Sequence, residues 1–170
     1  LTYGTDQNGA QGGHLVYDVW DPKTNTHYTL ENQTPTDIFC TVPVLVPGTG
    51  EILISGGDAR PLGAQNYGVE DVNVYDYRDM SIAPSPTGDM AYQRWYPTAI
   101  NLANGKILMI GGLDGGGQGV GMPELYQPGV GWKSLSGAYS EDIAGDWWYP
   151  RTWLNSSGEV VLFGTEYAME

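Results

Sequence analysis

Two residues far apart in the chain, Cys40 and Tyr96, are the first candidates for joint chemistry. Cys40 is the only cysteine, so the chain can form no internal disulfide. It ends the sequence Asp37-Ile38-Phe39-Cys40, and Tyr96 lies in Arg94-Trp95-Tyr96-Pro97. Each stands ahead of a predicted β-strand at the same place in a repeating unit, so we expect the two to be neighbours. Taken alone, a single cysteine is most often a small buried hydrophobe. A tyrosine taken alone is most often a core residue with a hydrogen-bonded hydroxyl.

The other residues of metal-binding or phosphate-binding type give weaker signals. His14 and His27 flank a predicted strand, but neither has a second histidine, cysteine or carboxylate at ligand spacing. Residues 141–146 hold three carboxylates that could bind a hard cation such as Ca²⁺, although the acidic composition favours a solvated loop. The glycine-rich stretches 7–13 and 115–121 lack the pattern of a phosphate-binding loop, and we expect both to be loops.

A strand-turn-strand unit that occurs three times must position these candidates. Its clearest copy is residues 97–112, in which two apolar, β-rich runs flank Asn104-Gly105. That dipeptide is typical of a type I′ hairpin turn, because both central positions need a positive φ. Residues 41–57 and 150–164 repeat the unit, and residues 1–4 resemble its last strand.

The repeat predicts the fold class. A glycine closes each unit, and these glycines recur roughly every 50 residues, the period of a kelch-type β-propeller with glycine pairs after its hairpins. Tyrosine-bearing segments after each glycine provide the two outer strands of a four-stranded blade, and blades must stack to bury their faces. We therefore expect an all-β, kelch-type β-propeller of about three blades. The predicted blade segments are 1–40, 41–95, 96–149 and 150–170.

The length and the charge of the chain limit the classes of protein and of partner that fit it. Rings usually close with about 4–8 blades, so we expect this chain to be part of a larger propeller. The net charge of −13 and the pI near 4.2 argue against nucleic acid and anionic membrane surfaces as partners. We also expect no insertion into a membrane. No apolar run approaches the length of a transmembrane helix.

The motifs DIFC and RWYPT, each ahead of a hairpin, resemble the copper radical oxidases, the family of galactose oxidase and glyoxal oxidase. The resemblance runs over essentially the whole chain in blade order, and it implies part of a normally seven-bladed catalytic propeller. In this family a cysteine sulfur is joined to the ring of a tyrosine that binds copper and holds a one-electron radical. Carried over, Cys40 is the thioether sulfur and Tyr96 the cross-linked copper ligand. The residues suit these roles, because a phenolate is a good Cu(II) ligand and a ring thioether stabilises a phenoxyl radical.

The same resemblance implies substrate-binding positions. Arg151 matches an arginine that hydrogen-bonds substrate hydroxyls, which suits a guanidinium with fixed donors, although a structural bond to a loop carbonyl is the alternative. Gln11 and Asp114 stand where galactose oxidase has a pocket aromatic and a tryptophan stacked over the thioether. Either Trp147 or Trp148 then shields the radical, or the radical is more exposed. These departures favour an aldehyde or a simple primary alcohol over galactose as substrate.

The family's remaining copper ligands are a tyrosine followed directly by histidine, and a later histidine. The chain has no Tyr-His pair, and both of its histidines precede Tyr96. We therefore expect C-terminal blades beyond this sequence to supply those ligands. The partners implied are an alcohol or aldehyde, O₂ and the remainder of the propeller, and the resemblance implies a secreted protein.

Two main hypotheses of function remain open. The first is an oxidase that converts an aldehyde or primary alcohol with O₂ to give H₂O₂, using copper and a Cys40-Tyr96 radical cofactor. The alternative is a non-catalytic kelch-type propeller that serves as a binding or scaffold module, in which Cys40 is a buried thiol. A carbohydrate-binding surface of exposed Trp and Tyr residues is a third, weaker hypothesis. The two motifs at matching blade positions favour the oxidase.

Overall fold

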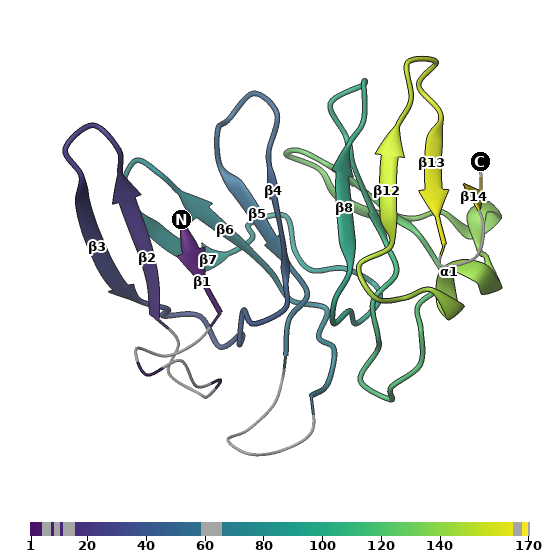
Figure 1. Cartoon of the computed structure of the whole chain (residues 1–170), viewed down its shortest axis with the longest axis horizontal. Coiled ribbons are helices and arrows are strands. Elements are labelled where there is room, and N and C mark those ends of the chain that lie inside the picture. The colour runs from purple at the N-terminus through teal and green to yellow at the C-terminus, as the bar shows by residue number, and fades with distance from the viewer. Residues whose placement is uncertain (5–7, 9–10, 12–15, 59–65, 165–167, 170) are drawn as a thin grey trace.

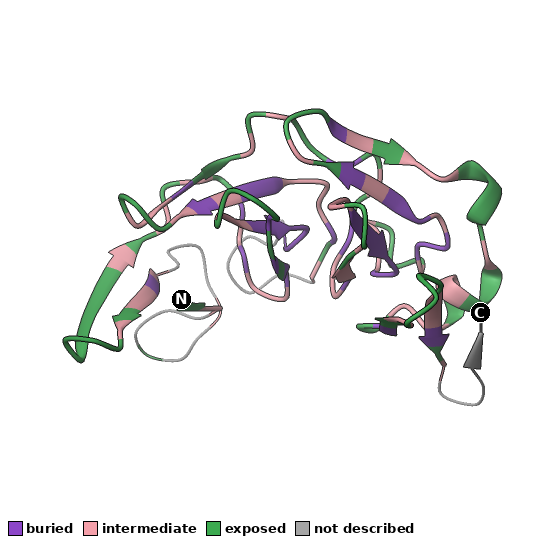
Figure 2. Ribbon diagram, turned by 90° about the horizontal axis from the view of Figure 1, so that it is seen from above, coloured by how far each residue is buried: buried purple, intermediate pink, exposed green. Residues whose placement is uncertain are grey.

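The computed structural model describes residues 1–4, 8, 11, 16–58, 66–164 and 168–169. Within them the chain is nearly all β, with four antiparallel sheets, one 3-10 turn (Ser136–Ala138) and one short helix, α1 (Glu141–Gly145). Figure 1 shows the sheets side by side from the N-terminal to the C-terminal end, and Figure 2 shows from above that they follow an arc. His14 and most of the stretch 7–13 lie outside the described residues.

The second and third sheets are complete four-stranded meanders. The second sheet contains β4 (Val42–Leu45), β5 (Ile52–Ser55), β6 (Val72–Asp76) and β7 (Ser81–Pro84). The third sheet contains β8 (Thr98–Asn101), β9 (Ile107–Ile110), β10 (Glu124–Gln127) and β11 (Gly131–Ser134). Within each of these sheets, consecutive strands pair antiparallel. Four consecutive strands in sequence order are the construction of a propeller blade.

The first and fourth sheets have three described strands each. The first contains β1 (Thr2–Tyr3), β2 (Val16–Asp21) and β3 (Thr26–Glu31). The fourth contains β12 (Arg151–Leu154), β13 (Val160–Phe163) and β14 (Ala168–Met169). By their order, the first sheet corresponds to the last three strands of a blade and the fourth to the first three. The all-β propeller architecture expected from the repeat is therefore confirmed.

Apolar side chains fill the spaces between neighbouring sheets. Because successive residues of a strand point to opposite faces, β9 serves two cores at once. Ile107 and Met109 pack against the second sheet, whereas Leu108 and Ile110 pack against Leu162 of the fourth sheet. Burying each such side chain contributes about 1.5–3 kcal/mol. The stacking of the sheets thus rests on ordinary hydrophobic burial, concentrated in the central strands of the arc (Figure 2).

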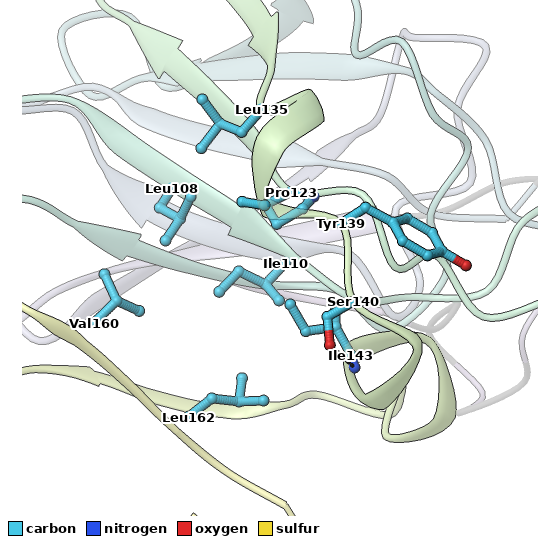
Figure 3. Close-up of a pocket in the computed structure, with 10 residues that line it drawn as sticks. Leu108, Ile110, Pro123, Leu135, Tyr139, Ser140, Ile143, Val160 and Leu162 are labelled. Carbon is cyan, nitrogen blue, oxygen red and sulfur yellow. Dashed lines mark hydrogen bonds between the residues drawn. The ribbon is translucent and has the colours of Figure 1, made fainter. Parts of the chain in front are cut away.

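The core between the third and fourth sheets is less filled. A cavity of about 420 Å³ lies there beside α1, and Figure 3 shows the side chains that surround it. Its lining is largely apolar and includes Leu108, Ile110, Ile143, Val160 and Leu162. Ser140 caps the helix, and its hydroxyl accepts the amide N–H groups of Asp142 and Ile143. A helix thus forms where a solvated loop was expected.

The turn between β8 and β9 differs from the expected type I′ turn. Only Gly105 has a positive φ, of 78°, and Asn104 does not. The Gly105 N–H donates to the Leu102 carbonyl, and the Leu102 N–H donates to the Lys106 carbonyl. The loop therefore contains one residue more than a two-residue turn, and the glycine alone takes the left-handed conformation, as in a hairpin with a glycine bulge.

Candidate active site

Three residues at one repeating position form the framework of the site: Cys40, Tyr96 and Tyr149. Each lies two residues ahead of the first strand of its sheet, β4, β8 or β12. Each also has a positive φ, of 60°, 63° and 45° respectively. Residues with a β-carbon rarely adopt this conformation, because it costs about 1–3 kcal/mol and persists only where the surroundings enforce it. The shared conformation shows that the three loops are built alike.

Backbone hydrogen bonds join the three residues in a row. The Tyr96 N–H donates to the Cys40 carbonyl oxygen at 3.1 Å, and the Tyr149 N–H donates to the Tyr96 carbonyl oxygen at 2.9 Å. Cys40 and Tyr96 thus lie side by side, as their matching blade positions led us to expect. Tyr149 was missed at the level of sequence. The available signal was the sequence WWYPRT, which precedes its strand as RWYPT does.

The side chains of Cys40 and Tyr96 also meet. Burial of the phenol, its hydrogen bond with the Cys40 side chain and the nearby charge of Asp58 raise the pKa of Tyr96 to about 12. Cys40 is half-buried and forms no disulfide. At neutral pH the Tyr96 phenol therefore keeps its proton in the absence of a metal. A cation that binds the phenolate must displace that proton.

Aromatic rings surround Tyr96. The Trp148 ring lies parallel to it, with centroids 4.9 Å apart and an interplanar angle of 9°. The Tyr149 ring meets it edge-on at 4.8 Å, and the Trp95 ring lies 4.1 Å away. Trp147 is more distant, at 6.4 Å, and stacks on Trp148. One face of the Tyr96 ring is therefore covered by Trp148, which comes from the loop ahead of the fourth sheet.

A buried ion pair anchors the loop that carries Tyr96. The Arg94 guanidinium donates to Glu124 on β10 at 2.9 and 3.2 Å, and also to the carbonyls of Gly111 and Met122. The second oxygen of the Glu124 carboxylate accepts the N–H of Ala91. Both charged side chains are fully buried. Burial lowers the pKa of Arg94, and the Glu124 charge opposes that shift. Arg94 therefore holds the loop in place and is not available to a substrate.

The glycine pairs that mark the repeat allow this loop to approach the strand ends. Gly56 has a φ of 76°, and a β-carbon there would lie 2.3 Å from the Arg94 carbonyl oxygen. Gly57 donates its N–H to the same oxygen at 3.0 Å. A side chain at position 56 would push the loop of Tyr96 away from the second sheet. The marker glycines thus have a direct part in placing Tyr96 beside Cys40.

Arg151 lines a cavity of about 400 Å³ next to the Tyr96 stack. Trp148 and Tyr149, which both contact the Tyr96 ring, form part of the same lining. The lining also includes Asp146 and Phe163. Phe163 on β13 pairs with Arg151 on β12 in the strand register. The cavity therefore offers aromatic surface, one guanidinium and one carboxylate beside the two rings, Trp148 and Tyr149, that contact Tyr96.

The structure gives Gln11 and Asp114 partners within the protein. The Gln11 side-chain amide donates to Asp58 at 2.8 Å, beside the loop that carries Cys40. The Asp114 carboxylate accepts the N–H groups of Gly116 and Gln118, and so shapes its own loop. Neither side chain is in the lining of the Arg151 cavity.

The described residues do not form a complete metal site. No group of three or more His, Cys, Asp or Glu side chains among them could hold a metal ion. His27 lies on β3, in contact with Asp18 at 2.7 Å and stacked on Trp20, on a strand that does not carry the Cys40–Tyr96 pair. What this part of the chain offers is a phenol beside a thiol. That donor set fits one Cu(II)-binding phenolate and its thioether, with the other ligands supplied from elsewhere.

Comparison with known proteins identifies the family of the chain. No protein-family model matches the chain. Two curated proteins named galactose oxidase, both from Gibberella zeae, are 30% identical to it over 136 residues. The chain belongs to the copper radical oxidase family. The match covers 76% of this chain but only 18% of each curated relative. The chain therefore spans a small part of the length of these relatives.

A solved structure agrees with the assignment at the level of fold. It is described as a novel fungal alcohol oxidase with catalytic diversity among the AA5 family, in complex with copper. The alignment covers 95% of this copper radical oxidase chain and 32% of the solved chain, with a TM-score of 0.68 and 21% identity. In the described part of the chain, no helix is both long and apolar enough to span a membrane.

Proposed function

We propose that the protein to which this chain belongs oxidises an aldehyde or a primary alcohol with O₂, using copper and a cross-linked Cys40-Tyr96 cofactor. The observation that carries the proposal is the direct adjacency of the lone thiol and one phenol. They are joined through the Tyr96 N–H and the Cys40 carbonyl, and their side chains meet as well. A buried thiol that served only as packing has no need of a phenol held beside it.

In this proposal Tyr96 and Cys40 form the redox unit. A carbon–sulfur bond forms between Cys40 Sγ and the Tyr96 ring carbon next to the hydroxyl, while the thiol hydrogen and one ring hydrogen are lost. The two electrons and two protons pass to O₂, which becomes H₂O₂. Bound copper supplies a second one-electron acceptor, so that metal and ring together can take two electrons from a substrate. Tyr96 then serves as a ligand and as the site of the radical.

The neighbouring residues protect the ring and orient the substrate. Trp148 takes the shielding role, because it lies parallel on the Tyr96 ring from the following blade. Arg151 directs a substrate oxygen from the adjoining cavity, with Trp148 and Tyr149 as walls. Gln11 and Asp114 act at the rim through the loops they hold. A tyrosine and histidines from the rest of the propeller complete the metal site, and the expected tyrosine accepts the substrate proton.

Two features support the proposed substrate class: the lining of the Arg151 cavity, and the replacement of the galactose oxidase aromatic residues by Gln11 and Asp114. The net reaction converts an alcohol to an aldehyde, or a hydrated aldehyde to an acid, as O₂ is reduced to H₂O₂. The lining combines one guanidinium, one carboxylate and the Tyr149 phenol with the Trp148 and Phe163 rings. That lining suits a small alcohol or aldehyde better than a sugar with many hydroxyls. The proposal includes an extracellular location, as the resemblance implies.

Intact mass tests the proposal directly. The full-length protein is purified without copper, then exposed to copper and air. We expect its mass to fall by two hydrogens and Cys40 to resist alkylation after denaturation. The matched variant Cys40→Ser should keep its mass under the same treatment. A thiol that stays fully alkylatable in the full-length, copper-treated protein would overturn the oxidase and favour a non-catalytic binding propeller.

A further inference from the structure

Asn155 begins the turn between β12 and β13 and is followed by Ser156 and Ser157. An asparagine with a serine or threonine two residues later is the acceptor pattern for an N-linked glycan, provided that the residue between them is not proline. The chain contains this pattern twice, at Asn155 and at Asn32. Because the pattern also arises by chance, the surroundings of each asparagine must decide between them.

The side-chain amide of Asn155 lies at the surface of the turn. Asn155 is partly exposed and residues 156–159 are exposed. Its Oδ1 accepts the N–H groups of Ser157 and Glu159, each at 2.9 Å, and its Nδ2 donates to the Glu159 carboxylate at 2.7 Å. The bond to the carboxylate is exposed, so water can replace either partner and its loss costs little. A sugar on Nδ2 therefore displaces no packed group.

The turn is also remote from the candidate active site. Tyr149 stands ahead of β12, and Asn155 follows it directly. The four residues of β12 advance the chain by roughly 13 Å, at about 3.3 Å per residue. Figure 1 shows the β12–β13 turn at the opposite end of the sheet from α1, the helix that leads into the loop of Trp148. A glycan on Asn155 thus leaves the Arg151 cavity open.

The side chain of Asn32 is held differently. Its Nδ2 donates to the Thr36 carbonyl at 2.8 Å, and its Oδ1 accepts both the N–H and the hydroxyl of Thr34. Thr36 is only 4% exposed and lies four residues ahead of Cys40. Asn32 therefore uses both ends of its amide to fix the segment that leads to Cys40. A sugar is bulky, and on this Nδ2 it would crowd the buried segment.

We propose that Asn155 carries an N-linked glycan in the secreted protein and that Asn32 does not. The inference rests on the extracellular location included in the proposed function. The donor is an oligosaccharide joined to a lipid through a diphosphate. The bond between the first sugar carbon and the diphosphate oxygen breaks, a bond from that carbon to Asn155 Nδ2 forms, and the amide loses one proton. The lipid diphosphate leaves with the bonding electrons, so nothing is oxidised or reduced.

The turn between β8 and β9 provides a comparison within the chain. Asn104 lies in this turn and is exposed, and its Oδ1 accepts the Lys106 N–H at 3.1 Å, as Asn155 accepts that of Ser157. The third residue of the pattern is Lys106 here, so the required hydroxyl is missing. Lys106→Thr supplies that hydroxyl and leaves Asn104 unchanged. It therefore reports whether the glycan-transferring enzyme can modify a turn at this end of a sheet.

The test uses the full-length protein, directed into the secretory pathway of a eukaryotic host by a signal sequence of that host. The wild type is compared with Asn155→Gln, Ser157→Ala, Ser157→Thr and Lys106→Thr. The readout is the mass of the peptides that contain Asn32, Asn104 and Asn155. These masses are measured before and after treatment with an amidase that removes N-linked glycans and leaves aspartate at each modified position.

We expect a glycan on the Asn155 peptide of the wild type, its complete loss in Asn155→Gln and Ser157→Ala, and its retention in Ser157→Thr. Lys106→Thr should add one glycan, at Asn104, and the Asn32 peptide should stay unmodified in every variant. A bare Asn155 in the secreted wild type would overturn the inference, most clearly if Asn104 is modified in Lys106→Thr. A glycan on Asn32 would overturn it as well.

Peroxide production by the same samples, with copper and an alcohol or aldehyde, tests the proposed oxidase separately. The host signal sequence ensures export, so modification of Asn155 does not depend on the natural location or on the activity. A glycosylated protein that produces no H₂O₂ would contradict the oxidase and support the assignment of Asn155. An active oxidase with a bare Asn155 would contradict the glycan alone.

Discussion

The two junctions between successive blades have the same backbone and different side chains. At the first junction, the Tyr96 N–H meets the Cys40 carbonyl, and at the second the Tyr149 N–H meets the Tyr96 carbonyl. All three residues have a positive φ at equivalent positions. Yet the first junction places a thiol beside the Tyr96 phenol, and the second places the Trp148 and Tyr149 rings against it. The propeller repeats a backbone position, and the residue at that position decides which side chains meet there.

The largest effect should come from replacing Cys40, the proposed thioether residue of the first junction. Cys40→Ser removes the sulfur while keeping a small polar side chain, so no thioether can form. We expect oxidase activity of the full-length protein to fall by roughly 10⁴-fold, equivalent to ~5.5 kcal/mol in the activation free energy. Peroxide production measures this change. The matched variant at the second junction, Tyr149→Phe, should still lose two hydrogens on maturation. A cross-link that fails in both variants would show that the junctions are not separable.

The next effect concerns the loop that both junctions share. Arg94→Met leaves Glu124 buried and without its cationic partner, which typically costs about 3–5 kcal/mol. We expect the free energy of unfolding to fall by that amount in chemical denaturation of the full-length protein. Arg78→Met is the control, because the Arg78 pairs with Asp76 and Glu51 lie at the surface. Equal losses in the two variants would contradict the anchoring role of Arg94.

A smaller effect should distinguish the cost of a steric collision from the cost of a left-handed backbone conformation. Gly56 and Gly105 have nearly the same φ, 76° and 78°, but only at Gly56 does a β-carbon collide with a neighbouring backbone. Gly105→Ala should cost about 1 kcal/mol for the left-handed conformation alone. Gly56→Ala should cost about 2–3 kcal/mol, because the loop of Tyr96 must also move. Denaturation midpoints measure the difference. Slower thioether formation in Gly56→Ala alone would link the close approach to the first junction.

The smallest effect should come from the shield at the second junction. Trp148→Ala removes a parallel ring from Tyr96, an interaction of about 0.5–1.5 kcal/mol. We expect the half-life of the Tyr96 radical to shorten by about tenfold at most, as followed by its decay in electron paramagnetic resonance. Trp153→Ala, which removes a half-exposed ring packed on Phe163, should leave the half-life unchanged. An unaltered radical half-life in Trp148→Ala would show that Trp148 is not the shield, and would leave Trp147 or Trp95 in that role or the radical exposed.

Local signals predicted the strands better than the turns between them. The hairpins at 41–57, 97–112 and 150–164 formed where apolar, β-rich runs on either side of a glycine turn indicated them. The predicted type of the Asn104-Gly105 turn was wrong, because the loop includes one further residue and forms a bulge. The dipeptide alone does not specify that extra residue. The short helix α1 also formed in a stretch that read as a loop. Its capping by Ser140 and the packing of Ile143 at the cavity decided that segment.

The candidate site was predictable only where a motif was strong enough to stand alone. Cys40 and Tyr96 were expected as neighbours from their equal positions in the repeat. Arg94 and Glu124, 30 residues apart, share no local pattern, so their ion pair was not foreseen. Asp58 was missed for the same reason, since the sequence does not reveal that a carboxylate after a glycine pair is buried between two loops.

The sequence by itself determined the repeat, its strands and the placing of a thiol and a phenol at equivalent points of successive units. These features depend on spacing and residue type, which are local properties of the chain. The tertiary structure alone decided that Trp148 covers the Tyr96 ring, that Tyr149 continues the row and that Asp58 is buried, with its N–H on the Asp37 carbonyl. Contacts between blades depend on how twisted sheets stack and how closely their loops approach, and no single segment of sequence encodes that geometry.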